Sequence, residues 1–304
     1  MTATSGGGFC LMSEAYGLAG MTETPLVIIE GMRGGPATGL PTWSGQGDLQ
    51  MVLHSHQDDF PRIVLAPGDV KEAYDLTIKA FDLADKYQTT ALVLMDKNIC
   101  ENDMTVSFPD VSNIKIDRGK FVKEKVENYL RYKYEDDGVS TRSIPGVGNY
   151  FLSNSDEHEE TGYSTEEIED RDKMMKKRMQ KLITCANNDM TDPEVFGPQN
   201  ADITVVSWGS NKGSVLEALK SFSNVNYIHV TWMSPFPTEF LTKELSKAKH
   251  IVDIECNYSG QLADIIREKT GIEITDRYLR SDGRVIYPEE IIEKLSLVEG
   301  VKKK

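Results

Sequence analysis

A glycine- and proline-rich segment around Arg33 carries the clearest chemistry in the sequence. The run Gly31–Thr42 holds one arginine among closely spaced glycines and directly follows the apolar run Pro25–Ile29. In open α/β sheets, ligands bind just beyond the carboxyl ends of strands, and an arginine there suits bidentate capture of a carboxylate or phosphate. Thr38 and Thr42 add hydroxyl donors. The pattern favours an anion-binding loop over the alternative, a purely structural glycine turn.

A second glycine run, Thr4–Gly8, lies directly before a segment whose apolar residues have helical spacing. Glycines permit close backbone approach, and the free N–H groups at the start of a helix attract anions. A phosphate or the edge of a cofactor could sit there, and a flexible terminus is the equally weighted alternative. The run is not a Walker loop, because no Gly-Lys-Ser/Thr follows it.

Two histidines, His54 and His56, precede Asp58 and Asp59 and raise the question of a metal site. Their i, i+2 spacing would put them on opposite sides of a helix, and no third-ligand pattern follows, so we predict no metal on this chain. The cysteines form no Cys-x-x-Cys pair, which excludes the usual local zinc and iron–sulfur signatures. We expect a reduced, small, buried apolar side chain at each of Cys10, Cys100, Cys185 and Cys256.

Three short apolar runs predict strands of a buried parallel sheet, at 25–29, 62–66 and 91–95. A helical stripe at 9–20 precedes the first of them. Between the second and third, Asp69 can cap a helix that runs to about Tyr87. The residues expected on its buried face are Ala73, Leu76, Ala80, Phe81 and Ala84. This alternation predicts a doubly wound α/β domain.

From about residue 97 to residue 200 the periodicity weakens, which predicts a long excursion. One helix interrupts it, with Ser164 and Glu167 as a capping box. Its expected apolar positions are Met174, Met175, Met179 and Leu182.

A second α/β unit follows, in strict alternation of strands and helices. The expected strands are 203–206, 227–230 and 251–254, and the expected helices are 212–222, 237–249 and 260–270.

The composition limits the classes of function. Apolar residues make up 39% of the chain, enough for a core, and a net charge of −14 argues against a nucleic-acid partner. Much of that charge lies in Asp156–Asp172, where a solvated surface is favoured over a docking face for a basic partner or adaptation to an acidic or saline host. Neither a membrane-spanning run nor a signal peptide is recognisable, so we expect no membrane contact and a cytoplasmic protein.

Motifs spread over essentially the whole chain carry a family resemblance. They are Thr2–Gly8, Arg33–Thr42, Gln46–Leu49, Phe60–Asp69, Asp156–His158 with Gly162, Lys177–Met179, Asn257–Ala263 and Arg280–Arg284. In combination they resemble the α subunit of 2-oxoacid:ferredoxin oxidoreductases, of the 2-oxoglutarate type. The resemblance implies an incomplete thiamine-diphosphate pyrimidine-binding domain over residues 1–200, which includes the excursion. A smaller transketolase C-terminal-like α/β domain would cover residues 201–304.

The implied chemistry is oxidative decarboxylation of a 2-oxoacid to acyl-CoA and CO2, with thiamine diphosphate as cofactor, coenzyme A as acyl acceptor and ferredoxin as electron acceptor. In this family the diphosphate, its Mg²⁺ and an iron–sulfur cluster are held mainly by the β subunit. We therefore expect a β-subunit partner, with γ or δ subunits as further candidates.

The resemblance also implies roles for single residues. Arg33 would grip the substrate carboxylate, and Thr38 and Gly39 would shape that pocket. The residues expected to face the cofactor are Thr4, Ser5, Gly6 and Gly7. We assign no catalytic residue to this chain, because Arg33 would position substrate rather than transfer protons.

The sequence departs from the family in one respect. A Tyr-Pro-Ile-Thr-Pro motif and a pyrimidine-activating glutamate usually precede the Thr-Ser-Gly loop, and neither is present. We therefore expect that the chain is N-terminally truncated, or that another polypeptide supplies these pieces, and that it is inactive alone. The competing hypothesis is a non-catalytic α/β interaction module, or a truncated remnant, that docks to a partner subunit.

Overall fold

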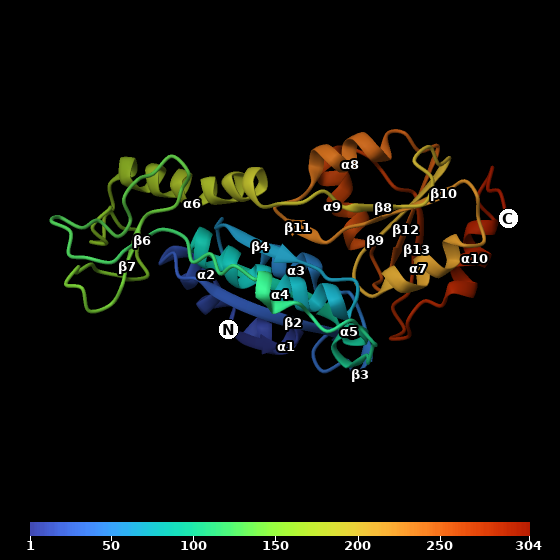
Figure 1. Ribbon diagram of the computed structural model, residues 1–304, viewed down its shortest axis with the longest axis horizontal. Coiled ribbons are helices and arrows are strands. Elements are labelled where there is room, and N and C mark those ends of the chain that lie inside the picture. Colours follow the sequence, from blue (N-terminus) through green and yellow to red (C-terminus); the bar gives the residue numbers. More distant parts are fainter.

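The computed structural model describes residues 1–304 except for the side chain of Asn113, and its strands form two large sheets. Figure 1 shows the first sheet in the middle of an elongated molecule, the second near the C-terminus, and a lobe at the opposite end. The expected α/β fold with a smaller second domain is confirmed. Within the described part of the chain, no helix combines the length and apolar character that crossing a bilayer requires.

The first sheet has the order β1-β2-β5-β4-β11, and β3 pairs with β2 outside this path. Four strands run parallel: β1 (Thr2–Thr4), β2 (Leu26–Gly34), β5 (Thr90–Asp96) and β4 (Arg62–Leu65). The three strands expected from the sequence are therefore confirmed. They are apolar on both faces because helices cover both sides of the sheet.

Alternate residues of each strand face different helices. Ile28, Val64 and Leu92 pack in one core cluster with residues of α1 (Gly6–Leu11), α2 (Ser13–Met21) and α3 (Leu49–His54). Val27 and Ile63 pack in another with α4 (Val70–Tyr87). Such alternation is the period-2 geometry of a strand, and it makes this domain a three-layer sandwich.

Helix α4 begins as the sequence indicated. Asp69 is the N-cap, and its carboxylate accepts a hydrogen bond of 2.8 Å from the backbone N–H of Glu72. Ala80 and Ala84 are buried as expected, but the expectation for Phe81 is wrong, because that ring is 46% exposed and Leu83 fills the core instead.

The segment after β2 is a hairpin rather than a free loop. Strand β2 continues through Gly34, and β3 (Leu40–Ser44) folds back antiparallel to it, with Arg33 opposite Ser44. The expectation of a loop from residue 31 is therefore wrong for its first part, since Arg33 lies within a strand. Pairing with β3 keeps this segment extended, which its glycine-rich sequence did not predict.

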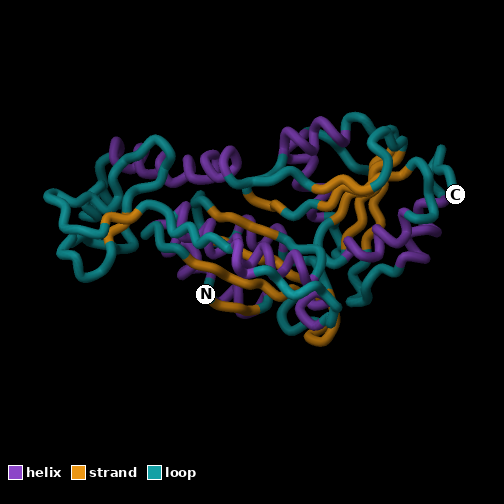
Figure 2. Tube along the Cα trace, in the orientation of Figure 1, coloured by secondary structure: helices purple, strands orange, loops and turns teal.

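The excursion forms the lobe and the return to the second domain. It contains α5 (Lys97–Glu101), a 3₁₀ turn (Val111–Asn113), the short strands β6 (Phe121–Val122) and β7 (Arg142–Ser143), and α6 (Ile168–Asn188). Figure 2 shows the lobe to be mostly loop, with α6 leading away from it.

Helix α6 differs from its expected form at both its start and its buried face. The capping-box expectation is wrong: Glu167 is the N-cap without a side-chain bond, and the Ser164 hydroxyl bonds Asp156 instead. Met174 is buried as expected, whereas Met175, Met179 and Leu182 are only partly buried. The other buried residues of α6 are Lys177, Arg178, Lys181 and Cys185.

Buried cations on α6 have carboxylate partners. Lys177 Nζ and Lys181 Nζ lie 2.5 and 2.6 Å from the carboxylate of Glu23, and Arg178 Nη2 lies 2.6 Å from Glu157. Removing charges from water is costly unless they are paired, so these contacts are what permit a charged helix face in the interior. The two lysine contacts fasten α6 to the turn between α2 and β2, and the Arg178 contact fastens it to the loop that precedes α6.

The second sheet has the order β13-β12-β9-β10-β8. Its strands are β9 (Ile203–Ser207), β10 (Val225–His229), β12 (His250–Glu255) and β13 (Asp276–Leu279), all parallel, and the antiparallel β8 (Glu194–Phe196). Its helices are α7 (Asn211–Leu219), α8 (Thr238–Leu245), α9 (Gln261–Thr270) and α10 (Pro288–Ser296). The expected strands and helices of this unit are all present.

Strands cross between the two halves of the chain. β8 precedes residue 201 yet belongs to the second sheet, and β11 (Trp232–Ser234) lies in the later half yet pairs antiparallel with β4 of the first sheet. The buried indole of Trp232 lies in the α4-side core of the first domain. The two sheets are therefore joined by exchanged strands.

Candidate functional site

Two of the segments singled out from the sequence meet at the carboxyl end of β2. Strand β1 pairs parallel with β2, with Thr4 opposite Glu30, so Ser5 emerges at the edge where Arg33 lies. Arg33 Nε donates to the hydroxyl of Ser5 over 3.4 Å, and Nη1 donates to the backbone oxygen of Thr38. The structure thus places the guanidinium between the Thr-Ser-Gly run and the hairpin.

The hairpin tip has a backbone that only glycine suits at one position. Gly39 has φ +50°, and a Cβ there would lie 2.1 Å from the backbone oxygen of Gly34. This turn places the Thr38 oxygen in reach of Arg33. Thr38 and Gly39 themselves are exposed, and so are Leu40 (39%) and Trp43 (49%).

The glycines of the first run differ in their surroundings. Helix α1 begins at Gly6, directly after Ser5, and the Ser5 side chain makes no capping bond. A Cβ on Gly6 would lie 3.1 Å from Oδ2 of Asp48, whereas a Cβ on Gly7 would meet no atom within 4 Å. The run therefore passes close to Asp48 on one side and leaves open space on the other.

Two carboxyl groups beside Arg33 were missed by the sequence reasoning. Glu30 on β2 is fully buried, and neither of its carboxylate oxygens has a hydrogen-bond partner among the described residues. Burial raises the pKa of Glu30 to about 8, the negative charge of Asp48 adds to this rise, and Arg33 opposes it. Burial also raises the pKa of Asp48, again against Arg33. An acid inside the apolar run 26–32 was the available signal.

The loop that carries Asp48 is fixed by the second domain. Gln46, which is fully buried, donates from Nε2 to Asp96 Oδ2 (3.1 Å) and to the backbone oxygen of Trp208 (3.0 Å). Its Oε1 accepts from the Cys256 N–H (2.8 Å) and from Asn211 Nδ2 (2.9 Å). Every hydrogen-bonding atom of this amide is used, so the loop position follows the second domain.

Two sequence motifs that are about 210 residues apart meet at this joint. Asn257 Nδ2 donates to the backbone oxygen of Gln46 (3.1 Å), and Gln261 Nε2 donates to that of Gly47 (2.7 Å). The motifs Gln46–Leu49 and Asn257–Ala263 therefore form one interdomain contact.

A buried carboxyl pair lies behind the joint, on β12. Glu255 accepts from Trp208 Nε1 (2.8 Å), Asn257 Nδ2 (2.7 Å) and the Leu262 N–H (2.8 Å). Burial and the charge of Glu255 raise the pKa of neighbouring Asp253 well above its ordinary value, and neither carboxyl oxygen of Asp253 has a hydrogen-bond partner among the described residues.

A cavity of about 340 Å³ opens beside the hairpin. It is lined by Thr42, Trp43 and Lys97 from the first domain and by Arg284 and Tyr287 from the second. Thr42 thus faces a polar space between the domains.

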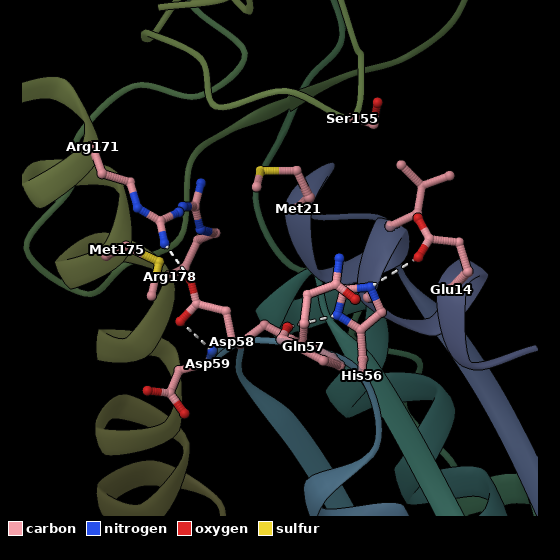
Figure 3. Close-up of a pocket in the computed structure, with 13 residues that line it drawn as sticks. Glu14, Met21, His56, Gln57, Asp58, Asp59, Ser155, Arg171, Met175 and Arg178 are labelled. Carbon is pink, nitrogen blue, oxygen red and sulfur yellow. Dashed lines mark hydrogen bonds and ion pairs between the residues drawn. The ribbon is translucent and has the colours of Figure 1, made fainter. Parts of the chain in front are cut away.

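Another cavity, of about 210 Å³, lies among α2, the 55–60 loop and α6 (Figure 3). Two side-chain contacts lie at its wall: Arg171 Nη2 lies 2.6 Å from Asp58, and His56 Nε2 lies 3.4 Å from Glu14. None of the residues singled out as substrate or cofactor contacts lines it, and the two contacts join the 55–60 loop to α6 and to α2.

The cysteine expectation is half right. Cys185 and Cys256 are buried, but Cys10 and Cys100 are exposed, and all four are free thiols. The described residues include no group of three or more metal-ligating side chains.

Comparisons with known proteins identify the family and the fold of the chain. A family model described as "Pyruvate flavodoxin/ferredoxin oxidoreductase, thiamine diP-bdg" matches residues 1–177, and "Pyruvate:ferredoxin oxidoreductase core domain II" matches residues 201–291. The 2-oxoacid:ferredoxin oxidoreductase subunit alpha of Saccharolobus solfataricus is 37% identical over 309 residues, covering 98% of this chain and 48% of that protein. The 2-oxoglutarate synthase subunit KorA of Methanocaldococcus jannaschii is 33% identical, covering 96% and 78%.

A solved structure shares the fold. The 2-oxoglutarate:ferredoxin oxidoreductase from Magnetococcus marinus, with 2-oxoglutarate, coenzyme A and succinyl-CoA bound, matches with a TM-score of 0.92 at 33% identity, over 97% of this chain and 52% of that chain. This chain spans about half the length of the first curated relatives that it matches. The resemblance inferred from the motifs is confirmed: the chain belongs to the family of 2-oxoacid:ferredoxin oxidoreductase alpha subunits.

Proposed function

We propose that the chain is the substrate-positioning part of a thiamine-dependent enzyme that oxidatively decarboxylates a 2-oxoacid, with 2-oxoglutarate preferred. The C–C bond to the carboxylate breaks, CO2 leaves, coenzyme A forms a thioester with loss of its thiol proton, and two electrons pass to ferredoxin. The observation that carries the proposal is the guanidinium of Arg33, held between Ser5 and Thr38 at the carboxyl edge of a parallel sheet.

Arg33 has donors left for a substrate. Its Nε and Nη1 bond Ser5 and Thr38, while Nη2 makes no hydrogen bond to any described residue. A carboxylate that approaches Nη2 meets a cation already oriented by the protein, which limits the entropy lost on binding. Thr38 and Gly39 are proposed to shape the substrate pocket because their turn positions the backbone oxygen of Thr38, which accepts a hydrogen bond from Arg33.

The residues at this edge fit the aminopyrimidine side of thiamine diphosphate. Gly7 leaves open space beside the start of α1, and the buried Glu30 carboxyl has no partner among the described residues. Thr4, Ser5, Gly6 and Gly7 would line that side. When bound, the cofactor supplies the carbon nucleophile for the keto group, and this chain orients the substrate carboxylate with Arg33.

The remaining parts of the reaction are assigned to partner chains. The exposed hairpin, with Leu40 and Trp43 at its surface, supports completion of the site by a β subunit. That subunit would hold the diphosphate, Mg²⁺ and an iron–sulfur cluster, with ferredoxin as electron acceptor and γ or δ subunits as further components. Cytoplasmic location is part of the same proposal.

The test is co-expression with a β subunit and an electron-acceptor assay that depends on both 2-oxoacid and coenzyme A. Arg33→Ala should raise the KM for 2-oxoglutarate by about 30- to 100-fold, because a charge-assisted hydrogen bond contributes roughly 2 kcal/mol or more. Arg267→Ala is the control, since that arginine side chain is 60% exposed and pairs with Glu273. Unchanged kinetic constants for Arg33→Ala would remove the assignment, and a complex that assembles without turnover would favour the interaction-module hypothesis.

A further inference from the structure

Glu30 is an anomaly within its strand. Its neighbours on the same face, Ile28 and Met32, are fully buried in the core, and Glu30 is equally buried. A carboxylate at such a position needs donors, yet none of the described residues bonds either oxygen. An apolar residue would stabilise the strand better, because burying an unpaired polar group costs free energy. The position therefore points to a role other than packing.

The charged groups around Glu30 are few. Arg33 follows three residues later on the same strand, Asp48 approaches from the loop before α3, and the Cys100 thiol approaches from α5. Burial raises the pKa of Cys100, so that thiol is neutral near pH 7. On the neighbouring strand β1, Thr4 lies opposite Glu30 and is followed by Ser5, and neither side chain titrates near neutral pH. The net charge of this corner of the site is therefore set by one cation, Arg33, and two acids, Glu30 and Asp48.

We propose that Glu30 is a positioning residue that sets how strongly Arg33 attracts the substrate carboxylate, binding being favoured while Glu30 is neutral, and that Asp48 tunes the pH at which this changes. The inference rests on the proposed role of Arg33. On this proposal, the affinity of the chain for the 2-oxoacid depends on pH through the protonation of Glu30.

The direction follows from the charges. With the pKa of Glu30 near 8, at pH 7 Glu30 is mostly protonated and the corner holds Arg33 positive against at most one negative charge on Asp48. Above pH 8 Glu30 ionises, and the corner becomes net negative. An anionic substrate then meets repulsion in a poorly solvated site, where a unit charge at several ångströms has an effect of one to a few kcal/mol. Affinity for the 2-oxoacid should fall as the pH rises.

The experiment uses the assembled complex and measures KM for 2-oxoglutarate between pH 6.5 and 9.5. For the wild type, KM should rise about tenfold or more through pH 8, while kcat follows a separate profile. Glu30→Gln keeps the shape and the neutral form, so its KM should stay flat. Glu14→Gln is the control, because that side chain, in the first turn of α2, is 82% exposed, and its profile should match the wild type.

Asp48→Asn provides a second variant that does not touch the core. Asp48 makes no side-chain capping bond to α3, so the amide should be tolerated. Removing its negative charge should lower the pKa of Glu30 and move the KM inflection to lower pH. A wild-type KM rise in Glu30→Gln, or an unmoved inflection in Asp48→Asn, would overturn the inference. Failure of Arg33→Ala to change KM would instead remove the proposed function, so the two failures are distinguishable.

Discussion

The ammonium nitrogen of Lys181 lies 2.6 Å from Oε2 of Glu23, and both side chains are almost completely buried. A second lysine, Lys177, binds the other oxygen of the same carboxylate. Burial alone would raise the pKa of Glu23, but the two ammonium groups outweigh it and hold that pKa well below its usual range. Burial lowers the pKa of Lys181 to about 7, so the cluster contains more cations than one carboxylate can compensate.

Lys181→Met should change how stability depends on pH. The pKa of Lys181 is lower in the folded chain than in the unfolded chain, so between about pH 7 and pH 10 the unfolded state binds the extra proton. Wild-type stability relative to Lys181→Met should therefore rise with pH across this window. Urea unfolding at several pH values measures the difference, and Lys176→Met, at a lysine whose side chain is 74% exposed, is the control. A pH-independent difference would contradict the lowered pKa.

Asp253→Asn should have the opposite direction of effect in the second domain. The pKa of Asp253 is raised on folding, so its contribution is fully present below its unfolded pKa and is lost as the pH rises through the folded value. An asparagine side chain has a similar shape and does not titrate. The variant should gain stability over the wild type as the pH increases from 4, which thermal unfolding can follow. A constant difference would show that Asp253 does not hold the proton.

Gln46→Leu should loosen the joint between the domains. The side-chain amide makes four hydrogen bonds, to Asp96, Trp208, Cys256 and Asn211. Leaving these buried partners unsatisfied should cost about 2–4 kcal/mol of unfolding free energy. In the assembled enzyme, the KM for 2-oxoglutarate should also change, because the same loop positions Asp48. Gln57→Leu, at an exposed glutamine, is the matched control, and equal losses in both variants would argue against the joint.

Gly39→Ala should raise the KM for 2-oxoacid with little effect on assembly. Its φ of +50° is unfavourable for alanine, and the added methyl group would meet the Gly34 oxygen. The turn would shift and move the Thr38 oxygen away from Arg33. Gly213→Ala, where a Cβ has open space, is the control. Wild-type kinetics in Gly39→Ala would show that the turn does not set the position of Arg33.

The parts of the fold that were predictable depend on local patterns. Strand 62–66 was recognisable because both of its faces are buried, and Asp69 was recognisable as a cap because it bonds within three residues. The hairpin was not, because the pairing of Arg33 with Ser44 is a tertiary preference that glycine-rich sequence does not reveal. Lys177 reads as a surface residue on a charged helix until its partner Glu23, 154 residues away, is known.

The candidate site likewise has residues that were recognisable from the sequence and residues that were not. Arg33 was identifiable because its neighbours are glycines after a strand, and its contact with Ser5 joins two motifs that were each recognisable alone. Glu30 was passed over because a single acid in an apolar run has no spacing pattern. Its surroundings are supplied by Asp48 and Cys100, which approach from different elements.

The strand exchange between the halves bears on how this protein could be dissected. A gene cut at residue 200 would separate β11 from β4, so the N-terminal fragment would lose the outermost strand of its sheet and the indole of Trp232 from its core. The C-terminal fragment would lose β8 and expose the edge of β10. Neither fragment would be a self-sufficient folding unit, and heat or denaturant should melt the chain as one cooperative block rather than in two steps.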